Sequence, residues 1–314
     1  MVLNNTLEKR IACIIVTYNR KQLLKRCLNS VVSQTSKPEV VYIMDNASTD
    51  GTMNSVKEWG YYECERNGVH FKYIQNERNE GGAGGFYLGL KTAYEDDSYD
   101  AFWVMDDDGA PDKNCLKILQ SYLSQYDYIA PLVISTESEE TLAFTCHDIV
   151  DKSEVLDKYA KDGLIKSYAC PFNGILYSSK LIQKIGYPKR EMFIWGDEQN
   201  YHVRAKKAGF YPVTVVEAIH HHPKDRQVKT TGLFGGEIVE IDSKWKWFCF
   251  SRNKIYNWIL QYGRAKATIY MIKFYVKYTW YFIKKRNLEF FLIMNESLYK
   301  GYTSNFSGLE KYFK

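Results

Sequence analysis

Short apolar runs alternate with amphipathic segments along the first two thirds of the chain. Runs dominated by apolar residues are typical of buried strands, and they occupy 11–16, 40–44, 71–74 and 101–105. Between them, apolar positions recur with helical spacing at 21–34, at 52–59 and up to about residue 94. Strands that alternate with helices form βαβ units, so the pattern predicts a Rossmann-like α/β fold with a mostly parallel central sheet.

The run at 101–105 stops abruptly at three consecutive carboxylates, Asp106, Asp107 and Asp108. Open α/β sheets bind their ligands at the carboxyl ends of the strands. Adjacent carboxylates repel one another, and a divalent metal ion among them removes that repulsion. Because side chains alternate along an extended segment, we expect Asp106 and Asp108 to face one ion and Asp107 to face elsewhere. A solvated turn before Pro111 is the alternative interpretation.

Polar motifs follow the other predicted strands as well: TYNR at 17–20, DNASTDG at 45–51 and GGAGGF at 81–86. Because the carboxyl ends of parallel strands share one edge, these motifs and the acidic triplet should converge on one crevice. Asp45 is suited to contact a ribose or a base, although it could instead only form an Asx-turn. Arg20 is suited to bind a phosphate, although it could instead be an ordinary exposed residue at the start of a helix. The glycine stretch matches neither GxGxxG nor a P-loop, but a ligand can approach its backbone closely just before a helix begins.

The second half of the sequence adds a further carboxylate. Residues 135–166 are polar with weak periodicity, and we interpret them as an excursion over the site before the apolar run at 171–177. Asp197 and Glu198 then open a predicted helix directly after aromatic residues at 193–195. A carboxylate beside an aromatic wall can act as a general base, although both acids could simply stabilise the start of the helix.

Three histidines, His220, His221 and His222, follow the last predicted strand at 211–219. Imidazole is a common metal ligand, so we expect one of the three to complete the metal shell from across the crevice, and we favour His221. A local turn with no metal ligand is the alternative.

Charge and aromatic residues are unevenly distributed along the 314 residues. The segment 244–314 contains 14 Lys or Arg residues, 3 acidic residues and 21 of the 49 aromatic residues, which gives it a net charge of +11. The first 243 residues carry a net charge of −6. This asymmetry indicates a negatively charged partner for a helical, basic and aromatic C-terminal extension, and we place the two domains at 1–235 and 236–314.

The extension has features of a helix at a membrane interface. Lys266, Lys273, Lys277 and Lys284 fall on one stripe of a helical wheel in an otherwise apolar and aromatic segment. Lysines that face anionic headgroups, with aromatic side chains at the boundary, would explain both the charge and the aromatic excess. A core helix with a solvated stripe and a homo-oligomer contact are the alternatives. Few arginines and many apolar residues argue against nucleic acid as a partner.

Two further features bear on the compartment. Seven cysteines lie far apart with no CxxC pair, which is typical of buried thiols in a reducing compartment. Only six apolar residues follow the charged residues at 8–10, too few for a signal peptide, and no stretch is long enough to span a membrane. We therefore expect a cytoplasmic protein that is peripheral on the inner face of the cell membrane.

Several motifs in combination resemble family-2 glycosyltransferases of the GT-A fold, and the match runs from residue 11 to about 223. They are TYNR, DNASTDGT, NEGGAGGF at 79–86, WVMDDD at 103–108, WGDE at 195–198 and the later histidine. Within that family, the combination is most similar to bacterial galactofuranosyltransferases and rhamnosyltransferases. The sequence departs from the family's processive synthases, since it lacks a QxxRW motif and spanning helices, and it has DDD where many relatives have DxD.

The resemblance implies a role for each candidate residue. Asp106, Asp108 and His221 would hold Mn²⁺ or Mg²⁺ on the donor pyrophosphate. Asp197 would take the proton of the acceptor hydroxyl in a one-step, inverting displacement. The donor would contact Thr17, Tyr18, Asn19, Arg20, Asp45, Asn79, Gly82, Gly84, Asp106 and Asp107. The acceptor would contact Asn173, Trp195 and Glu198.

Together these observations predict a metal-dependent inverting glycosyltransferase of polysaccharide, cell-wall or capsule biosynthesis. UDP-galactofuranose is the favoured donor and dTDP-rhamnose the alternative, with a lipid-linked or polysaccharide acceptor. A nucleotidyltransferase would need a basic triphosphate loop, which the sequence lacks. An inactive, membrane-associated binding module would have no need of Asp197 or the acidic triplet.

Overall fold

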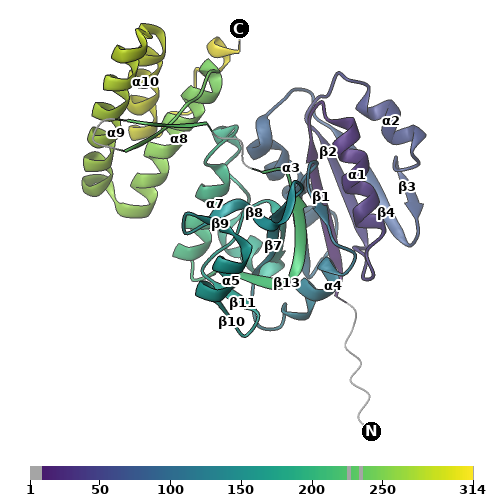
Figure 1. Cartoon of the computed structure of the whole chain (residues 1–314). Coiled ribbons are helices and arrows are strands. Elements are labelled where there is room, and N and C mark those ends of the chain that lie inside the picture. The colour runs from purple at the N-terminus through teal and green to yellow at the C-terminus, as the bar shows by residue number, and fades with distance from the viewer. Residues whose placement is uncertain (1–8, 225–227, 233–235, 314) are drawn as a thin grey trace. The chain divides into compact units, whose positions relative to one another are not determined.

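The computed structural model describes residues 9–224, 228–232 and 236–313 (Figure 1). The chain forms two compact units. The first unit comprises the chain up to Glu80 together with Gly85–Tyr187 and Arg204–Asp225, and the second comprises Gly81–Gly84, Pro188–Val203 and the chain from Arg226 onward. Helices α3 (Gly81–Asp96) and α7 (Asp197–Lys207) begin in the second unit and continue in the first.

The first unit is built on a mixed sheet that contains the strands predicted from the apolar runs, together with a fully buried strand at 128–135 that sequence reasoning does not predict. The strands of the sheet are β1 (Ile11–Thr17), β2 (Val40–Asp45), β3 (Cys64–Arg66), β4 (Val69–Gln75), β5 (Ala101–Asp106), β6 (Ala110–Pro111), β7 (Tyr128–Ser135), β8 (Ser138–Cys146), β9 (Ile149–Asp151), β10 (Ala160–Lys161), β11 (Leu164–Lys166), β12 (Asn173–Ser178) and β13 (Val213–His222). Their main order is β10-β11-β13-β7-β12-β5-β1-β2-β4-β3. The neighbours β5, β1, β2 and β4 are parallel, β13 is parallel to β7, and β12 is antiparallel to both β5 and β7.

Helices cover both faces of this sheet, which explains why its central strands are apolar on both sides. Cys13 and Ile15 of β1 pack in one cluster with Leu24 of α1 (Lys21–Val32), and the same cluster includes residues of α2 (Thr52–Glu58) and α4 (Cys115–Ser121). On the opposite face, α3 lies so close to β1 that a Cβ atom on Gly89 would lie 2.6 Å from Ile14 Cγ2. A short helix, α6 (Ser179–Ile185), follows β12.

The glycine stretch is helical, which differs from the expected loop before a helix. α3 begins at Gly81, so Gly81–Gly84 form its first turn. A Cβ atom on Gly85 would lie 2.4 Å from Val16 Cγ1, so the small residue is required where this helix meets the sheet. That close approach outweighs the low intrinsic helix propensity of glycine.

Residues 135–166, which we interpret from the sequence as an excursion over the site, form regular secondary structure. β8 pairs with β7, and β11 pairs with β13, both in antiparallel fashion. Between them lies α5 (Lys152–Tyr159), whose N-terminus is capped by the Asp151 carboxylate accepting from the Glu154 amide at 2.8 Å. β9, β10 and β11 are only two or three residues long, and β8 is longer but polar and exposed along its first residues. Strands at the periphery of a sheet bury only part of their surface.

The second unit contains three long helices, α8 (Lys244–Tyr262), α9 (Arg264–Lys285) and α10 (Leu288–Tyr302). They share one core of aromatic and aliphatic side chains, including Trp247, Phe274 and Met294. The unit also contains a hairpin of β14 (Lys229–Thr231) and β15 (Glu237–Val239) and two single turns, η1 (Arg190–Met192) and η3 (Glu310–Tyr312). The predicted helical character of the C-terminal segment is confirmed.

Two findings concern the expectations about compartment. All seven cysteines are free, and six of them are buried. Within the part of the chain that the structure describes, no helix has the length and apolar character needed to cross a membrane.

Candidate active site

The ends of three strands carry the side chains that the sequence singles out. In the sheet ladder, Thr17 of β1 pairs with Asp45 of β2, and β1 has β5, which ends at Asp106, on its other side. Asn173 begins the antiparallel strand β12 and pairs with Met105 of β5. The register therefore brings these motifs to one edge of the sheet in the first unit, as the parallel strands predict.

Asp107 is the most buried member of the triplet, with 2% of its surface exposed. Its carboxylate accepts a hydrogen bond of 2.6 Å from Thr17 Oγ1, and Arg20 Nη1 lies 3.5 Å from the other oxygen. Burial raises the pKa of Asp107 to about 6, although the Thr17 hydroxyl and the Arg20 charge oppose that shift. Asp107 thus connects the triplet to the end of β1 through its hydrogen bond with Thr17.

Asp108 lies between Arg20 and His222. Arg20 Nη1 is 2.9 Å from Asp108 Oδ2, and His222 Nε2 is 3.1 Å from Asp108 Oδ1. Burial acts to raise the pKa of Asp108, but the hydrogen bond and charge of His222 and the charge of Arg20 outweigh it and lower the pKa. Asp108 is therefore an ionised carboxylate at neutral pH, beside an imidazole nitrogen.

The histidine beside the triplet is His222, whereas His221 points away from it. His221 Nε2 lies 2.8 Å from Asp112 Oδ1, and its Nδ1 lies 3.7 Å from Glu139 Oε1. The three histidines are not a turn, because β13 continues through His222 and pairs with both β6 and β7. Side chains alternate along a strand, so His221 must face opposite to His222.

His220 is completely buried directly behind the triplet. A Cβ atom on Gly109 would lie 2.3 Å from His220 Nε2, and one on Gly174 would lie 2.6 Å from Nδ1, so two glycines make room for the ring. Burial lowers the pKa of His220 to about 3, which keeps the imidazole neutral. Neither ring nitrogen has a hydrogen-bond partner among the described residues.

The motif at 45–51 is organised around Asp45, which has no exposed surface. Its Oδ1 accepts from the Ser48 amide at 2.8 Å, and its Oδ2 accepts from the Tyr73 hydroxyl. The Ser48 bond is the turn that we considered as the alternative role of Asp45. Nearby, Asn19 Oδ1 accepts from the Thr49 amide at 2.7 Å, which joins the loops after β1 and β2.

Three further candidate residues of the first unit are more available to a ligand. Tyr18 is 41% exposed. Asn173 is 8% exposed; its Nδ2 donates to Pro171 O at 2.9 Å, and its Oδ1 has no partner among the residues described. Asn79 is half-buried just before α3. The unpartnered oxygen of Asn173 is itself buried, so of these three residues Tyr18 is the most accessible to a ligand.

The chemistry of this edge fits a divalent metal that is shared with a nucleotide. In the described ranges, no three His, Cys, Asp or Glu side chains converge as a ready metal site. Asp108 and His222 nevertheless lie 3.1 Å apart. Mg²⁺ commonly takes one or two carboxylates and completes its shell with phosphate oxygens and water, and imidazole suits Mn²⁺ as well. The residues present therefore fit such an ion.

In the second unit, Asp197 is the first residue of α7 and is 4% exposed. The loop before it has left-handed backbone angles at Phe193 (φ 68°), Trp195 (φ 58°) and Gly196 (φ 98°). Gly82, in the first turn of α3, lies beside Asp197, since an added Cβ would be 4.0 Å from Asp197 Oδ2. Non-glycine residues in this conformation are uncommon and cluster at functional sites.

The other predicted site residues of the second unit lie in the segments next to Asp197 in the chain or in the first turn of α3. Glu198 accepts a hydrogen bond from the Gly196 amide at 2.9 Å. It therefore stabilises the start of α7, which is the alternative role considered for it. Trp195 is half-buried, and Lys246 Nζ lies 5.7 Å from its ring centroid. Gly84 belongs to the first turn of α3.

Sequence reasoning named all three histidines and favoured His221, because it ended the last strand at 219, where the apolar run stops. The alternation rule applied to a strand that continues through 222 would have separated His221 from its two neighbours. It also missed the pairing of β6 with β13, which brings the residues after the triplet to the histidines. A strand of two residues leaves no apolar pattern to detect.

Comparisons with known proteins give a family match and similar relatives for this chain. Residues 12–182 match the model of a family described as glycosyl transferase family 2. The chain is 28% identical over 287 residues to the galactofuranosyltransferase GlfT1 of Mycolicibacterium smegmatis, an alignment that covers 88% of this chain and 90% of that protein.

Similar solved structures have the same fold. S. aureus TarS 1–349 in complex with UDP-GlcNAc has a TM-score of 0.56 at 17% identity, covering 93% of this chain and 80% of that one. The mannosyltransferase PcManGT from Pyrobaculum calidifontis, in complex with GDP-Man and Mn²⁺, has a TM-score of 0.54 at 17% identity, covering 81% of this chain and 64% of that one. The chain spans 36% of another solved TarS chain.

Proposed function

The chain belongs to glycosyl transferase family 2 and is a glycosyltransferase of the GT-A fold, and we propose that it transfers galactofuranose from UDP-galactofuranose to a lipid-linked or polysaccharide acceptor. The observation that carries this proposal is the similarity to a galactofuranosyltransferase over 88% of the chain. An alignment of that length includes residues of both units, and therefore both the strand-end carboxylates and the Asp197 loop.

On the donor side, the residues that follow β1, β2 and β5 bind the nucleotide diphosphate. Arg20 supports this role, since 53% of its side chain is exposed while its guanidinium is already oriented by Asp107 and Asp108. Oriented cations are suited to phosphate oxygens. Tyr18, Asn19, Asp45 and Asp107 contact or frame the nucleoside, together with Asn79 and the glycines of α3.

Asp106, Asp108 and His222 would hold Mn²⁺ or Mg²⁺ against the donor diphosphate. Such an ion stabilises the negative charge of the departing nucleotide diphosphate. We assign His222 in place of His221 because His222 contacts Asp108, whereas His221 contacts Asp112. Arg20 shares Asp108 with that histidine and adds positive charge for the leaving group.

Asp197 is the proposed general base. Its carboxylate accepts the proton of the acceptor hydroxyl as the hydroxyl oxygen bonds to the anomeric carbon and the bond from that carbon to the diphosphate oxygen breaks. A single displacement inverts the configuration at that carbon. Trp195, Glu198 and Asn173 are the proposed acceptor contacts, because a half-buried indole offers an apolar face to a sugar ring while the other two offer oxygens.

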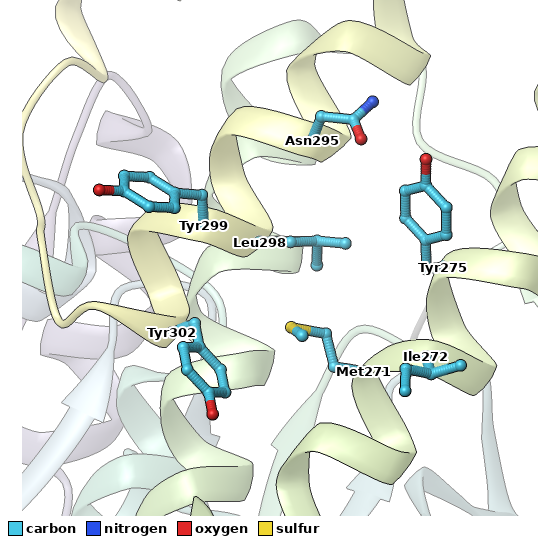
Figure 2. A pocket seen from close by; sticks show the side chains of 7 residues that line it. All are labelled: Met271, Ile272, Tyr275, Asn295, Leu298, Tyr299 and Tyr302. Carbon is cyan, nitrogen blue, oxygen red and sulfur yellow. The ribbon is translucent and has the colours of Figure 1, made fainter.

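We also propose that the second unit contacts the membrane that carries a lipid-linked acceptor. A cavity of about 280 Å³ lies between α9 and α10, and Figure 2 shows Ile272, Tyr275 and Leu298 among the apolar side chains around it. Several apolar residues of the same helices are more than half exposed: Ile269, Ile272, Ile283, Leu288, Leu292 and Tyr299. Exposed apolar side chains on adjacent helices are suited to insertion among acyl chains.

Lysines near this apolar surface favour anionic headgroups. Lys254, Lys273 and Lys277 line a second cavity of about 240 Å³ with Trp258 and Tyr270. Burial, and to a smaller extent the charge of Lys277, lowers the pKa of Lys254. An anion in this cavity would relieve the repulsion between the lysines.

Binding to anionic vesicles should weaken about tenfold when Ile272 is replaced by Asp. The substitution removes an exposed apolar side chain and adds a charge that anionic headgroups repel. Co-sedimentation with phosphatidylglycerol and with phosphatidylcholine vesicles measures the effect. Val150→Asp, at an exposed apolar residue of the first unit, is the matched control and should bind as the parent protein does. Unchanged vesicle binding by I272D, with a change in oligomeric state, would assign the face to a contact between copies.

The donor assignment predicts that UDP-galactofuranose with Mn²⁺ stabilises the protein against heating, whereas dTDP-rhamnose and UDP-glucose do not. A ligand at about 100 times its Kd adds about 2.7 kcal/mol of stability, which is a shift of several degrees in Tm. Thermal unfolding and slow donor hydrolysis both report this selectivity. A response to dTDP-rhamnose alone would make the protein a rhamnosyltransferase, and pyrophosphate release from a nucleoside triphosphate would make it a nucleotidyltransferase. Binding without hydrolysis or transfer would make it a binding module.

A further inference from the structure

The loop that leads into Asp197 has a backbone that must be held in place. Phe193 and Trp195 have φ angles of 68° and 58°, a region that residues with a Cβ atom rarely occupy. Such conformations persist only where surrounding contacts determine them. The contacts that hold this loop are therefore part of the machinery around Asp197.

Asn253 of α8 supplies the largest share of those contacts. Its side chain has no exposed surface. Its Nδ2 lies 2.9 Å from Met192 O, 3.0 Å from Ile194 O and 2.8 Å from Trp195 O. The amide is oriented by Arg252, whose Nε donates to Asn253 Oδ1 at 3.0 Å, so that the nitrogen faces the loop.

Asn257, one helical turn further along α8, holds the end of the loop. Its Nδ2 donates to Gly196 O at 2.7 Å, next to Asp197 in the chain, and its Oδ1 accepts from Asn200 Nδ2 at 3.0 Å. Glycine suits position 196 because its φ is 98° and because an added Cβ would lie 3.1 Å from Asn253 Cβ, a tight contact. Asn257 is also without exposed surface.

The opposite side of the loop is held by the first turn of α3. The Ala83 amide donates to Phe193 O at 3.1 Å. A Cβ atom on Gly81 would lie 2.0 Å from the same oxygen, so only glycine allows this contact. The carbonyl oxygens of residues 192 to 196 thus all accept hydrogen bonds, four of them from the two asparagines of α8.

Among the described residues, side chains other than these asparagines make the polar contacts between α8 and α10. Ser251 Oγ lies 2.6 Å from Ser297 Oγ, Trp247 Nε1 donates to Phe290 O at 3.1 Å, and Lys244 Nζ lies 2.6 Å from Glu289 Oε1. Buried amides lower stability unless their hydrogen bonds are satisfied. The side-chain amides of Asn253 and Asn257 both donate to the loop. A helix packed only for stability would carry apolar residues at these positions.

We propose that Asn253 and Asn257 are positioning residues that set the orientation of Asp197 through the backbone of residues 192–196. This inference rests on the proposed role of Asp197 as the base. It makes α8 a part of the catalytic apparatus in addition to its role in the core of the second unit. Arg252 supports the arrangement by fixing the Asn253 amide and by donating to Met192 O at 2.9 Å.

Asn253→Ala should lower kcat by about 100-fold while the KM for the donor and the affinity for UDP stay within about twofold, since a misplacement near 1 Å has an effect of that size. Asn257→Ala, which loses one bond to the loop, should lower kcat by about tenfold. Ser251→Ala is the matched control, because Ser251 is an equally buried polar residue of α8 that faces α10 and not the loop, and it should keep the parental kcat. Circular dichroism and thermal unfolding establish whether each variant is folded. If Asn253→Ala does not fold, the kcat of Asn257→Ala tests the positioning role.

A double-mutant cycle separates positioning from a general structural effect. If Asn253 acts through Asp197, Asn253→Ala should have no further effect on the residual rate of Asp197→Asn. Additive losses, or a parental kcat in folded Asn253→Ala and Asn257→Ala, would overturn the inference and leave the proposed function standing. Full activity of Asp197→Asn would instead remove the base assignment itself.

Discussion

Asp197→Asn should reduce glycosyl transfer by about 1,000-fold or more without changing the affinity for the nucleotide donor. The amide has the shape of the carboxylate and can remain at the first position of α7, but it cannot take a proton from the acceptor hydroxyl. General bases contribute about 10²-fold to 10⁴-fold to the rate, and the substitution removes that contribution.

The measurement compares kcat for transfer with the Kd for UDP in the presence of Mn²⁺. Glu154→Gln is the matched control, because Glu154 is also an acid in the first turn of a helix, α5, and is paired with Lys158 at 2.6 Å. Loss of transfer in both variants would point to an effect of acidic helix starts on folding. Retained turnover in Asp197→Asn would remove Asp197 as the base.

Asp108→Ala should abolish the metal-dependent part of nucleotide binding, which we expect to be a loss of about 100-fold in affinity for UDP with Mn²⁺, at the upper end of what a metal-site residue contributes. The substitution removes the carboxylate that contacts both Arg20 and His222. Without it, the nearby positive charges remain but the hard oxygen ligand that Mn²⁺ or Mg²⁺ requires is gone. Isothermal titration with UDP in Mn²⁺ and in EDTA separates the two contributions.

Two pairs of variants test the identity of the metal ligands. His222→Ala should weaken Mn²⁺-dependent binding in the same direction as Asp108→Ala, whereas His221→Ala should not. Asp112→Ala is the control for the triplet, since Asp112 is a neighbouring carboxylate that pairs with His221 and has 54% of its side chain exposed. Equal affinity for UDP with Mn²⁺ and with EDTA in the parent protein would refute the metal assignment.

Much of the first unit could be predicted from sequence because its central strands are apolar on both faces and end abruptly in polar motifs. β1, β2 and β5 have this character, and their common edge followed from their parallel direction. The outer strands could not be predicted, because a strand with one exposed face and few residues, such as β9 or β10, leaves too short a pattern. The helical start of α3 at Gly81 was hidden because glycine is a poor helix former unless close packing requires it.

The sequence indicated which strand ends carry the candidate residues but not the contacts that these residues make. The triplet was expected to present Asp106 and Asp108 to an ion, and the structure adds that Asp107 is buried against Thr17. Asn253 gave no signal, because a polar residue on a predicted helix is ordinarily solvated. Its partners, about 60 residues away at 192–195, are backbone oxygens, which carry no side-chain information.

The row of asparagines on α8 has a consequence for exchanging parts between relatives. A Cβ atom on Gly301 of α10 would lie 2.3 Å from Arg252 O, so α8 and α10 are matched to each other as closely as α8 is matched to the loop. A chimera in which residues 244–302 are replaced by the helices of a relative would also lose the side chains of α8 that hold residues 192–196. We therefore expect the proposed membrane contact and the turnover rate to change together when the C-terminal helices are transplanted.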